Sequence, residues 1–94
     1  MEKTIELHSL IARNGEVLTS DLDGEIGMFH VETGKYYTLG RVSADIWQLL
    51  EQPLTLEQLV EKLMEQYEVD QATCAEQTIA FLLQLNKINL VSIQ

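Results

Sequence analysis

The sequence is poor in cysteine, in proline and in long apolar runs, with one cysteine and one proline among 94 residues. A single cysteine, Cys74, excludes a disulfide within the chain. A membrane-spanning helix needs roughly 20 consecutive apolar residues, and no apolar run approaches that length. The first six residues show no basic start followed by an apolar core, so we expect no secretory signal. These absences predict a cytoplasmic protein that does not enter the membrane.

Basic residues are also scarce. Six lysines and arginines stand against fifteen aspartates and glutamates, which gives a net charge of −9. Such a chain repels phosphate backbones and anionic lipids, and it attracts basic peptides over a Debye length of about 8 Å. Residues 42–94 are the more acidic part, with eight acidic and two basic residues. The composition favours a cationic partner and argues against nucleic acid.

The chain lacks the residue groups that catalysis needs. His8 and His30 fall in separate predicted strands, without another histidine or cysteine at metal-ligand spacing, so we expect surface or half-buried side chains with no ligand role. Cys74 has Asp70 and Glu76 nearby instead of a histidine or a positive field, which favours a small buried apolar residue over a nucleophile. No glycine-rich phosphate-binding motif occurs. We expect no enzyme activity, no metal and no cofactor.

The composition is that of a folded chain, with 46% apolar and 22% charged residues, and 94 residues form one core, so we expect a single domain. All five glycines lie in residues 1–40. Dipeptides typical of tight hairpin turns stand at Asn14-Gly15, Asp23-Gly24 and Thr33-Gly34. Antiparallel strands are predicted at residues 17–22, 25–31 and 35–39. Whether residues 5–12 form a fourth strand is left undecided. Gly27 interrupts the third of these segments and indicates a bulge.

From residue 42 the apolar spacing becomes helical. The first predicted helix covers residues 42–51 and ends before Pro53. The second begins at Thr55, which forms a capping box with Gln58, and the third runs from an Asp70 cap to about residue 87. Asn89 then suits a left-handed helix end, and residues 90–93 alternate like a terminal strand. We expect an α+β, winged-helix-like fold, with an N-terminal antiparallel sheet packed on a C-terminal three-helix bundle.

The third predicted helix has more apolar surface than one contact needs. Its apolar residues form two adjoining stripes, one of Ala75, Ile79 and Leu82 and the other of Cys74, Phe81 and Leu85. Winged-helix DNA readers share this order of elements, but a reading helix needs exposed basic or asparagine residues at its start. This helix begins Asp70-Gln71-Ala72-Thr73 and carries Glu76, which disfavours a DNA-binding function.

Residues 34–40 read Gly-Lys-Tyr-Tyr-Thr-Leu-Gly and are followed by Ile46-Trp47 and Pro53. Together with Ser-Asp-Leu-Asp-Gly-Glu at residues 20–25, and with Cys74 and Phe81-Leu82 farther on, they resemble the PqqD-like family. The similarity is to its stand-alone members from lasso-peptide biosynthesis and covers residues 20–91. It implies a RiPP recognition element, in which a three-stranded sheet packs against three helices and performs no catalysis.

In that family the leader segment of a ribosomally made precursor peptide lies extended beside the strand that corresponds to residues 35–39. The apolar side chains of the leader pack between this strand and the third helix. The leader backbone joins the free edge of the sheet, a binding mode called strand addition. The resemblance and the second apolar stripe together predict a peptide-binding site, made of Lys35, Tyr36, Tyr37, Thr38, Leu39, Asp70, Cys74, Glu76, Gln77, Thr78, Phe81 and Leu85.

Three features of this site stay open. Tyr36 and Thr38 face one side of their strand and Tyr37 and Leu39 the other, and the sequence does not decide which pair borders the groove. The second stripe of the third helix fits a groove wall or plain core. Thr78 stands where the family usually has an aliphatic residue, so the sequence does not determine the shape of the groove.

The resemblance implies a peptide adaptor that delivers a basic, extended leader to a separate leader peptidase, and through it to a cyclase. One alternative is a peptide chaperone that presents a precursor to a radical-SAM enzyme, as in pyrroloquinoline quinone biosynthesis. A winged-helix DNA-binding protein is the alternative from another class, and the net charge of −9 disfavours it. A dimerisation domain follows if the edge strand pairs with its own copy. We expect a monomer or a weak dimer.

Overall fold

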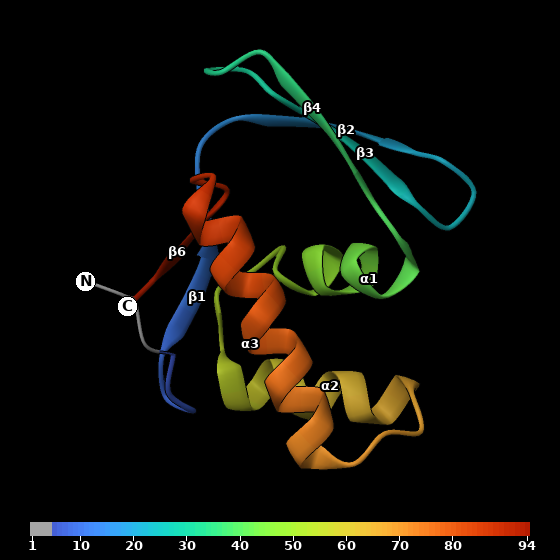
Figure 1. The fold of residues 1–94 in the computed structure, drawn as a ribbon, viewed down its shortest axis with the longest axis vertical. Coiled ribbons are helices and arrows are strands. Elements are labelled where there is room, and N and C mark those ends of the chain that lie inside the picture. The colour runs from blue at the N-terminus through green and yellow to red at the C-terminus, as the bar shows by residue number, and fades with distance from the viewer. Residues whose placement is uncertain (1–4) are drawn as a thin grey trace.

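The computed structural model describes residues 5–94, which form two small sheets and three helices (Figure 1). One sheet has the strand order β2-β3-β4, from β2 (Val17–Asp21), β3 (Ile26–His30) and β4 (Lys35–Leu39). The other has the order β5-β1-β6, from β1 (Leu10–Arg13), β5 (Leu54–Thr55) and β6 (Val91–Ile93). The helices are α1 (Arg41–Leu49), α2 (Leu56–Gln66) and α3 (Gln71–Lys87). The predicted α+β class, with its three-stranded antiparallel sheet and three helices, is confirmed.

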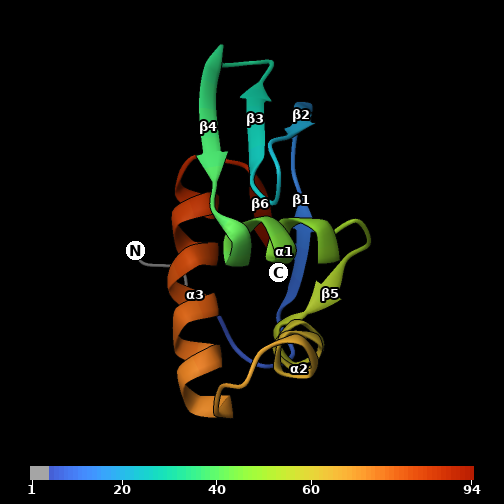
Figure 2. The same cartoon turned by 90° about the vertical axis from the view of Figure 1, so that its right-hand side faces the viewer.

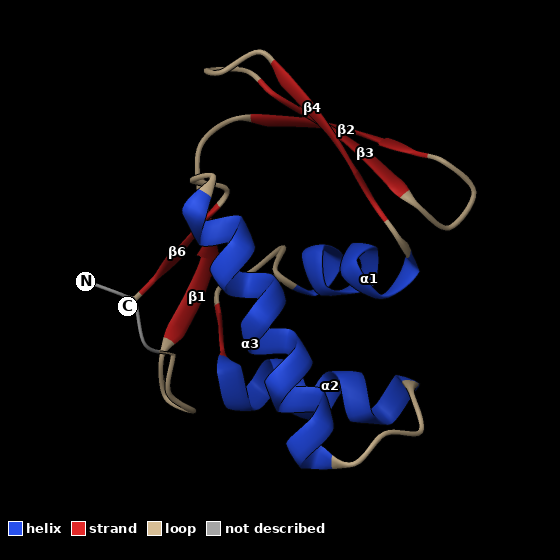
Figure 3. Ribbon diagram, in the orientation of Figure 1, coloured by secondary structure: helices blue, strands red, loops and turns tan. Residues whose placement is uncertain are grey.

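The β2-β3-β4 sheet is a meander joined by short turns, and all three helices lie on one side of it (Figure 3). Asp23 and Gly24 both have positive φ, at 60° and 95°, and they form the predicted hairpin turn between β2 and β3. Gly34, with φ 73°, lies in the turn between β3 and β4. The hairpin predicted at Asn14-Gly15 is wrong, because this turn joins β1 to β2 and these strands belong to different sheets.

The predicted bulge at Gly27 is also wrong. Gly27 pairs regularly with Ser20 on one side and with Thr38 on the other. A Cβ atom at this position would collide with the hydroxyl of Tyr36. The glycine therefore makes room for the Tyr36 ring, which lies across the outer face of the sheet.

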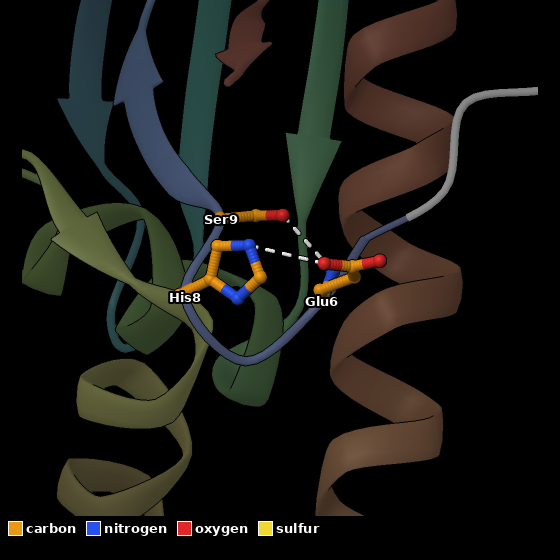
Figure 4. Close-up of polar contacts among 3 residues, drawn as sticks. All are labelled: Glu6, His8 and Ser9. Carbon is orange, nitrogen blue, oxygen red and sulfur yellow. Dashed lines mark hydrogen bonds and ion pairs between the residues drawn. The ribbon is translucent and has the colours of Figure 1, made fainter.

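Residues 5–12, for which a fourth strand was left undecided, form a turn followed by β1. In the turn the Glu6 amide donates to Ser9 Oγ at 2.9 Å, and His8 Nε2 lies 3.0 Å from Glu6 Oε2 (Figure 4). The carbonyls of Leu7 and Ser9 accept from the amides of Glu57 and Leu56 at the start of α2. The first amides of a helix have no partner within it, and the carbonyls of the turn supply these partners. Only residues 10–13 then pair with other strands as β1.

Local capping signals account for the helix ends. Thr55 and Gln58 form the predicted capping box of α2, with the Gln58 amide 3.2 Å from Thr55 Oγ1. Asp70 Oδ2 accepts from the Thr73 amide at 3.1 Å at the start of α3. Hydrogen bonds from the side chain and then the backbone of Thr73 lower the pKa of Asp70. Asn89 has the predicted positive φ, at 65°. None of the helices in residues 5–94 is long and apolar enough to cross a membrane.

One apolar core joins both sheets and all three helices. Met28 of β3, Leu59 of α2 and Leu82 of α3 are fully buried in it. Ile11 and Val91 bring in the second sheet, so the cluster is continuous. Leu39 of β4 and Ile46 of α1 belong to the same cluster, so burial ties the edge strand and this helix to the common core.

Candidate functional site

β4 is an edge strand, because among residues 5–94 it pairs with β3 alone. Figure 2 shows it as the outer strand of its sheet, on the same side of the molecule as α3. Tyr37 and Leu39 pack against the core, whereas Tyr36 and Thr38 are exposed on the opposite face. The unpaired edge of β4 offers backbone N–H and C=O groups to another extended chain. Side chains of an added strand on the Tyr37 and Leu39 face would point toward the helices.

A pocket of about 440 Å³ opens between the helices, close to the point where β4 passes into α1. Its lining comes from α1, from the end of α2 with the following loop, and from α3. The lining residues are Val42, Ser43, Ile46, Leu63, Tyr67, Glu68, Val69, Cys74, Gln77, Thr78 and Phe81. Its volume falls in the range of ordinary ligand pockets, and most of its walls are apolar.

Four of the residues predicted on α3 meet in this pocket, namely Cys74, Gln77, Thr78 and Phe81. Cys74 and Thr78 are buried, as is Leu85, which lies in the core and does not line the pocket. The second apolar stripe is therefore part pocket wall and part core. The buried Cys74 agrees with the prediction of a small apolar residue.

The other predicted residues do not line the pocket. Asp70 caps α3, and Glu76 is exposed on the same helix. None of residues 35–39 of β4 lines the pocket, and the strand is followed in the chain by α1, whose first turns do. Their role in peptide binding stays a prediction.

The first turns of α1 supply lining residues that the sequence reasoning missed. Val42, Ser43 and Ile46 line the pocket, and Val42 is half exposed although it is apolar. Tyr67, Glu68 and Val69, which connect α2 to α3, were missed as well. An apolar residue on the exposed side of an amphipathic helix was the one signal available for Val42.

A hydrogen bond joins two walls of the pocket. The Tyr67 hydroxyl, at the end of α2, donates to Asp45 Oδ2 of α1. This bond raises the pKa of Tyr67 above its ordinary value of 10.0, because the neutral phenol is the donor and a phenolate would face a carboxylate. The pair therefore holds α1 against the end of α2 as long as Tyr67 is protonated.

The Tyr67 bond predicts an alkaline loss of stability that a Tyr67→Phe variant lacks. The folded pKa is raised, so the stabilisation is complete below pH 10.0, the ordinary pKa, and is lost as pH rises through the folded pKa. At neutral pH we expect Tyr67→Phe to lower the free energy of unfolding by about 1 kcal/mol, which is less than the roughly 1.5–3 kcal/mol of a hydrogen bond to a charged group because the site is partly exposed. Urea denaturation at about pH 8 and about pH 11 measures this, and a gap that persists at the higher pH contradicts it.

The histidines lie apart from the pocket. His8 is exposed, as predicted, but His30 is 1% exposed and its Nδ1 accepts from the Thr33 amide at 3.4 Å. The expectation of a surface or half-buried side chain is wrong for His30, because its position in β3 faces the core. Within residues 5–94, no three histidine, cysteine, aspartate or glutamate side chains are grouped so that they could hold a metal ion.

The chain thus has a free sheet edge next to an apolar pocket. The sequence profile described as Coenzyme PQQ synthesis protein D (PqqD) matches residues 25–91, a span that includes β4 and the whole pocket. The chain belongs to the PqqD family. The resemblance predicted from the sequence is thereby confirmed.

A solved structure is similar to this PqqD-family protein. It is described as TbiB1 in complex with the TbiA(beta) leader peptide, and it superimposes with a TM-score of 0.76 at 32% sequence identity. The alignment covers 84% of this chain and 93% of TbiB1. No curated protein matches the chain.

Proposed function

We propose that this PqqD-family protein is a cytoplasmic, non-catalytic adaptor that binds the leader segment of a ribosomally made lasso precursor peptide. It delivers the bound peptide to a separate leader peptidase, and through it to a cyclase. The observation that carries the proposal is the free edge of β4 beside an apolar pocket in α1 and α3. A leader peptide is also the partner with which TbiB1 was solved.

The geometry supports binding by strand addition. The leader extends the β2-β3-β4 sheet, and its backbone bonds the edge of β4, which gives affinity without regard to sequence. Its side chains alternate, so those on the side of Tyr37 and Leu39 turn toward the helices. One of these enters the pocket near Phe81, where burial of apolar surface adds selectivity.

The charge of the chain supports a basic leader. Glu68 lies in the pocket lining, and Asp70 and Glu76 are exposed on or next to α3. With a net charge of −9, the protein attracts a cationic peptide before contact and repels nucleic acid. Affinity for such a leader therefore weakens as salt increases.

The family description favours a second candidate with the same binding site. A protein described as Coenzyme PQQ synthesis protein D suggests presentation of a precursor to the radical-SAM enzyme of that pathway. The two candidates differ in the enzyme that receives the peptide. Adaptor-dependent leader cleavage by a peptidase supports the lasso pathway, and adaptor-dependent radical-SAM turnover supports the other.

Titration of a fluorescent leader peptide from the same pathway tests peptide binding. We expect saturable binding that weakens at high salt, and a loss of about tenfold or more when Tyr37→Ala and Phe81→Ala are combined, because both side chains border the proposed path. Met64→Ala, an exposed apolar residue of α2 outside the pocket, is the matched control. Absence of saturable binding, or equal binding by the double variant, contradicts the proposal.

A further inference from the structure

The β2-β3-β4 sheet has a second free edge, which is β2. Among residues 5–94, β2 pairs with β3 alone, and Figure 2 shows β2 and β4 at opposite edges of the sheet. The strand therefore offers backbone N–H and C=O groups to another extended chain. Thr19 and Asp21 lie opposite Met28 and Ile26, which are buried in the core. Alternate side chains of a strand added at β2 would likewise point to the helix side of the sheet.

A small polar pocket lies on this side of β2. It has a volume of about 130 Å³, and its walls come from β2 and β3, from Arg13 at the end of β1, and from Trp47 and Gln48 of α1. At about 30 Å³ for each water it has room for roughly four waters, which is close to the size of one polar side chain. It shares no lining residue with the larger pocket beside β4.

Two side chains of this pocket carry hydrogen-bond donors in fixed positions. Nε and Nη2 of Arg13 donate to the Trp47 carbonyl, and the guanidinium carbon lies 4.5 Å from the centroid of the Trp47 ring. These bonds use two of the three guanidinium nitrogens. Trp47 is 3% exposed, and its Nε1–H has no hydrogen-bond partner among residues 5–94. A buried donor without an acceptor costs free energy, so an occupant that supplies an acceptor is favoured.

The charges of the pocket select a neutral occupant. Arg13 and Asp21 both line it, yet no ion pair links them within the described part of the chain. A carboxylate in the pocket would be repelled by Asp21 and by Glu51, whose charge also acts on Arg13. An ammonium group would be repelled by Arg13. A carboxamide is neutral and has both an acceptor oxygen for the donors and an NH₂ group for Asp21.

A second copy of the chain does not supply such a group. The free edges of its β2-β3-β4 sheet are Val17–Asp21 and Lys35–Leu39, and neither strand contains asparagine or glutamine. Antiparallel pairing of two β2 strands would also bring the acidic residues at their ends, Glu16 and Asp21, close together. The occupant is therefore a segment of a different protein.

We propose that the β2 edge and this polar pocket form a second strand-binding site, for an extended segment of a partner protein that carries a glutamine or asparagine. The segment bonds the backbone of β2, and its carboxamide enters the pocket. The carboxamide oxygen accepts from Arg13 and Trp47, and the NH₂ group donates to Asp21. The site does not depend on leader binding, so the chain can hold one extended segment at each edge of the sheet.

A peptide titration followed at Trp47 tests this site. The chain has one tryptophan, so its indole N–H gives a single NMR signal. The probe is the peptide acetyl-Lys-Thr-Val-Gln-Val-Thr-Lys-amide, and two matched peptides carry leucine or glutamate in place of the glutamine. We expect the glutamine peptide to shift the Trp47 signal saturably, with a dissociation constant of about 1 mM. The leucine and glutamate peptides should bind at least about tenfold more weakly, because neither supplies both an acceptor and a donor.

An Asp21→Val variant removes the acceptor from the pocket and keeps a residue suited to a strand. We expect it to bind the glutamine peptide about tenfold more weakly. Glu16→Val is the matched control, because it removes the same charge next to the other end of β2 and outside the pocket, and its affinity should stay within about twofold. Both positions are exposed, so neither change removes a core contact.

The double variant with Tyr37→Ala and Phe81→Ala distinguishes the two edges. It alters β4 and the larger pocket, so it should bind the glutamine peptide as wild type does. Loss of binding in this variant would place the peptide at β4 and overturn the proposal. A Trp47 signal that responds alike to all three peptides, or to none, overturns it as well, as does full binding by Asp21→Val. None of these results bears on leader binding, which the fluorescent leader titration tests separately.

Discussion

A Gln77→Trp substitution should weaken leader binding about 100-fold and leave the protein as stable as wild type. Gln77 is exposed and lines the pocket from α3, so a larger side chain at this position has room to turn inward. The pocket walls include Phe81, Val69 and Ile46, and burying the indole against them is favourable. The ring then occupies the space that a leader side chain needs. We expect affinity to fall about 100-fold, which corresponds to about 2.7 kcal/mol.

Ala80→Trp is the matched control for this substitution. Ala80 lies on α3, is exposed, and does not line the pocket. Fluorescence anisotropy with labelled leader and thermal unfolding should show wild-type behaviour for Ala80→Trp, and about 100-fold weaker binding with unchanged or higher stability for Gln77→Trp. Normal binding by Gln77→Trp would show that the leader does not use the pocket. Equal losses in both variants would place the contact elsewhere on α3.

The parts of the fold that depend on neighbouring residues could be predicted from the sequence. The Asp23-Gly24 turn, the capping box at Thr55 and the left-handed Asn89 each arise within a few residues of chain. The second sheet could not be predicted, because β1 pairs with β5 more than 40 residues later and with β6 about 80 residues later. Without that pairing, the alternating residues 5–12 fit a fourth strand of the first sheet equally well.

The candidate site also has residues that could be predicted from the sequence and residues that could not. The pocket residues Cys74, Gln77, Thr78 and Phe81 could be predicted because helical spacing puts them on one side of α3. Val42 and Tyr67 were missed, because the pocket forms only where α1 and the end of α2 meet α3. Such crossings depend on tertiary packing and leave no periodic mark in the sequence.

An Arg13→Met substitution should lower the free energy of unfolding by about 2 kcal/mol. Arg13 Nε and Nη2 donate to the backbone carbonyl of Trp47, at 3.2 Å and 2.5 Å, across 34 residues of sequence. The guanidinium carbon lies 4.5 Å from the centroid of the Trp47 ring. Burial lowers the pKa of Arg13, so the group is partly desolvated and its bonds are stronger than fully exposed ones. A charged hydrogen bond contributes about 1.5–3 kcal/mol and a cation–π contact about 0.5–1, and partial exposure reduces the sum.

An Arg13→Lys substitution separates the effect of the positive charge from that of the paired hydrogen bonds to the Trp47 carbonyl. Lysine keeps a positive charge near the last turn of α1, where the helix dipole favours a cation, but it lacks the paired nitrogens that reach the Trp47 carbonyl. We expect a loss of about 1 kcal/mol, half that of Arg13→Met, in urea denaturation. Equal stability of all three proteins would show that the contact contributes nothing. Because α1 also carries Val42 and Ser43 of the pocket, loosening of its end should weaken leader binding in the same order, with Arg13→Met weaker than Arg13→Lys.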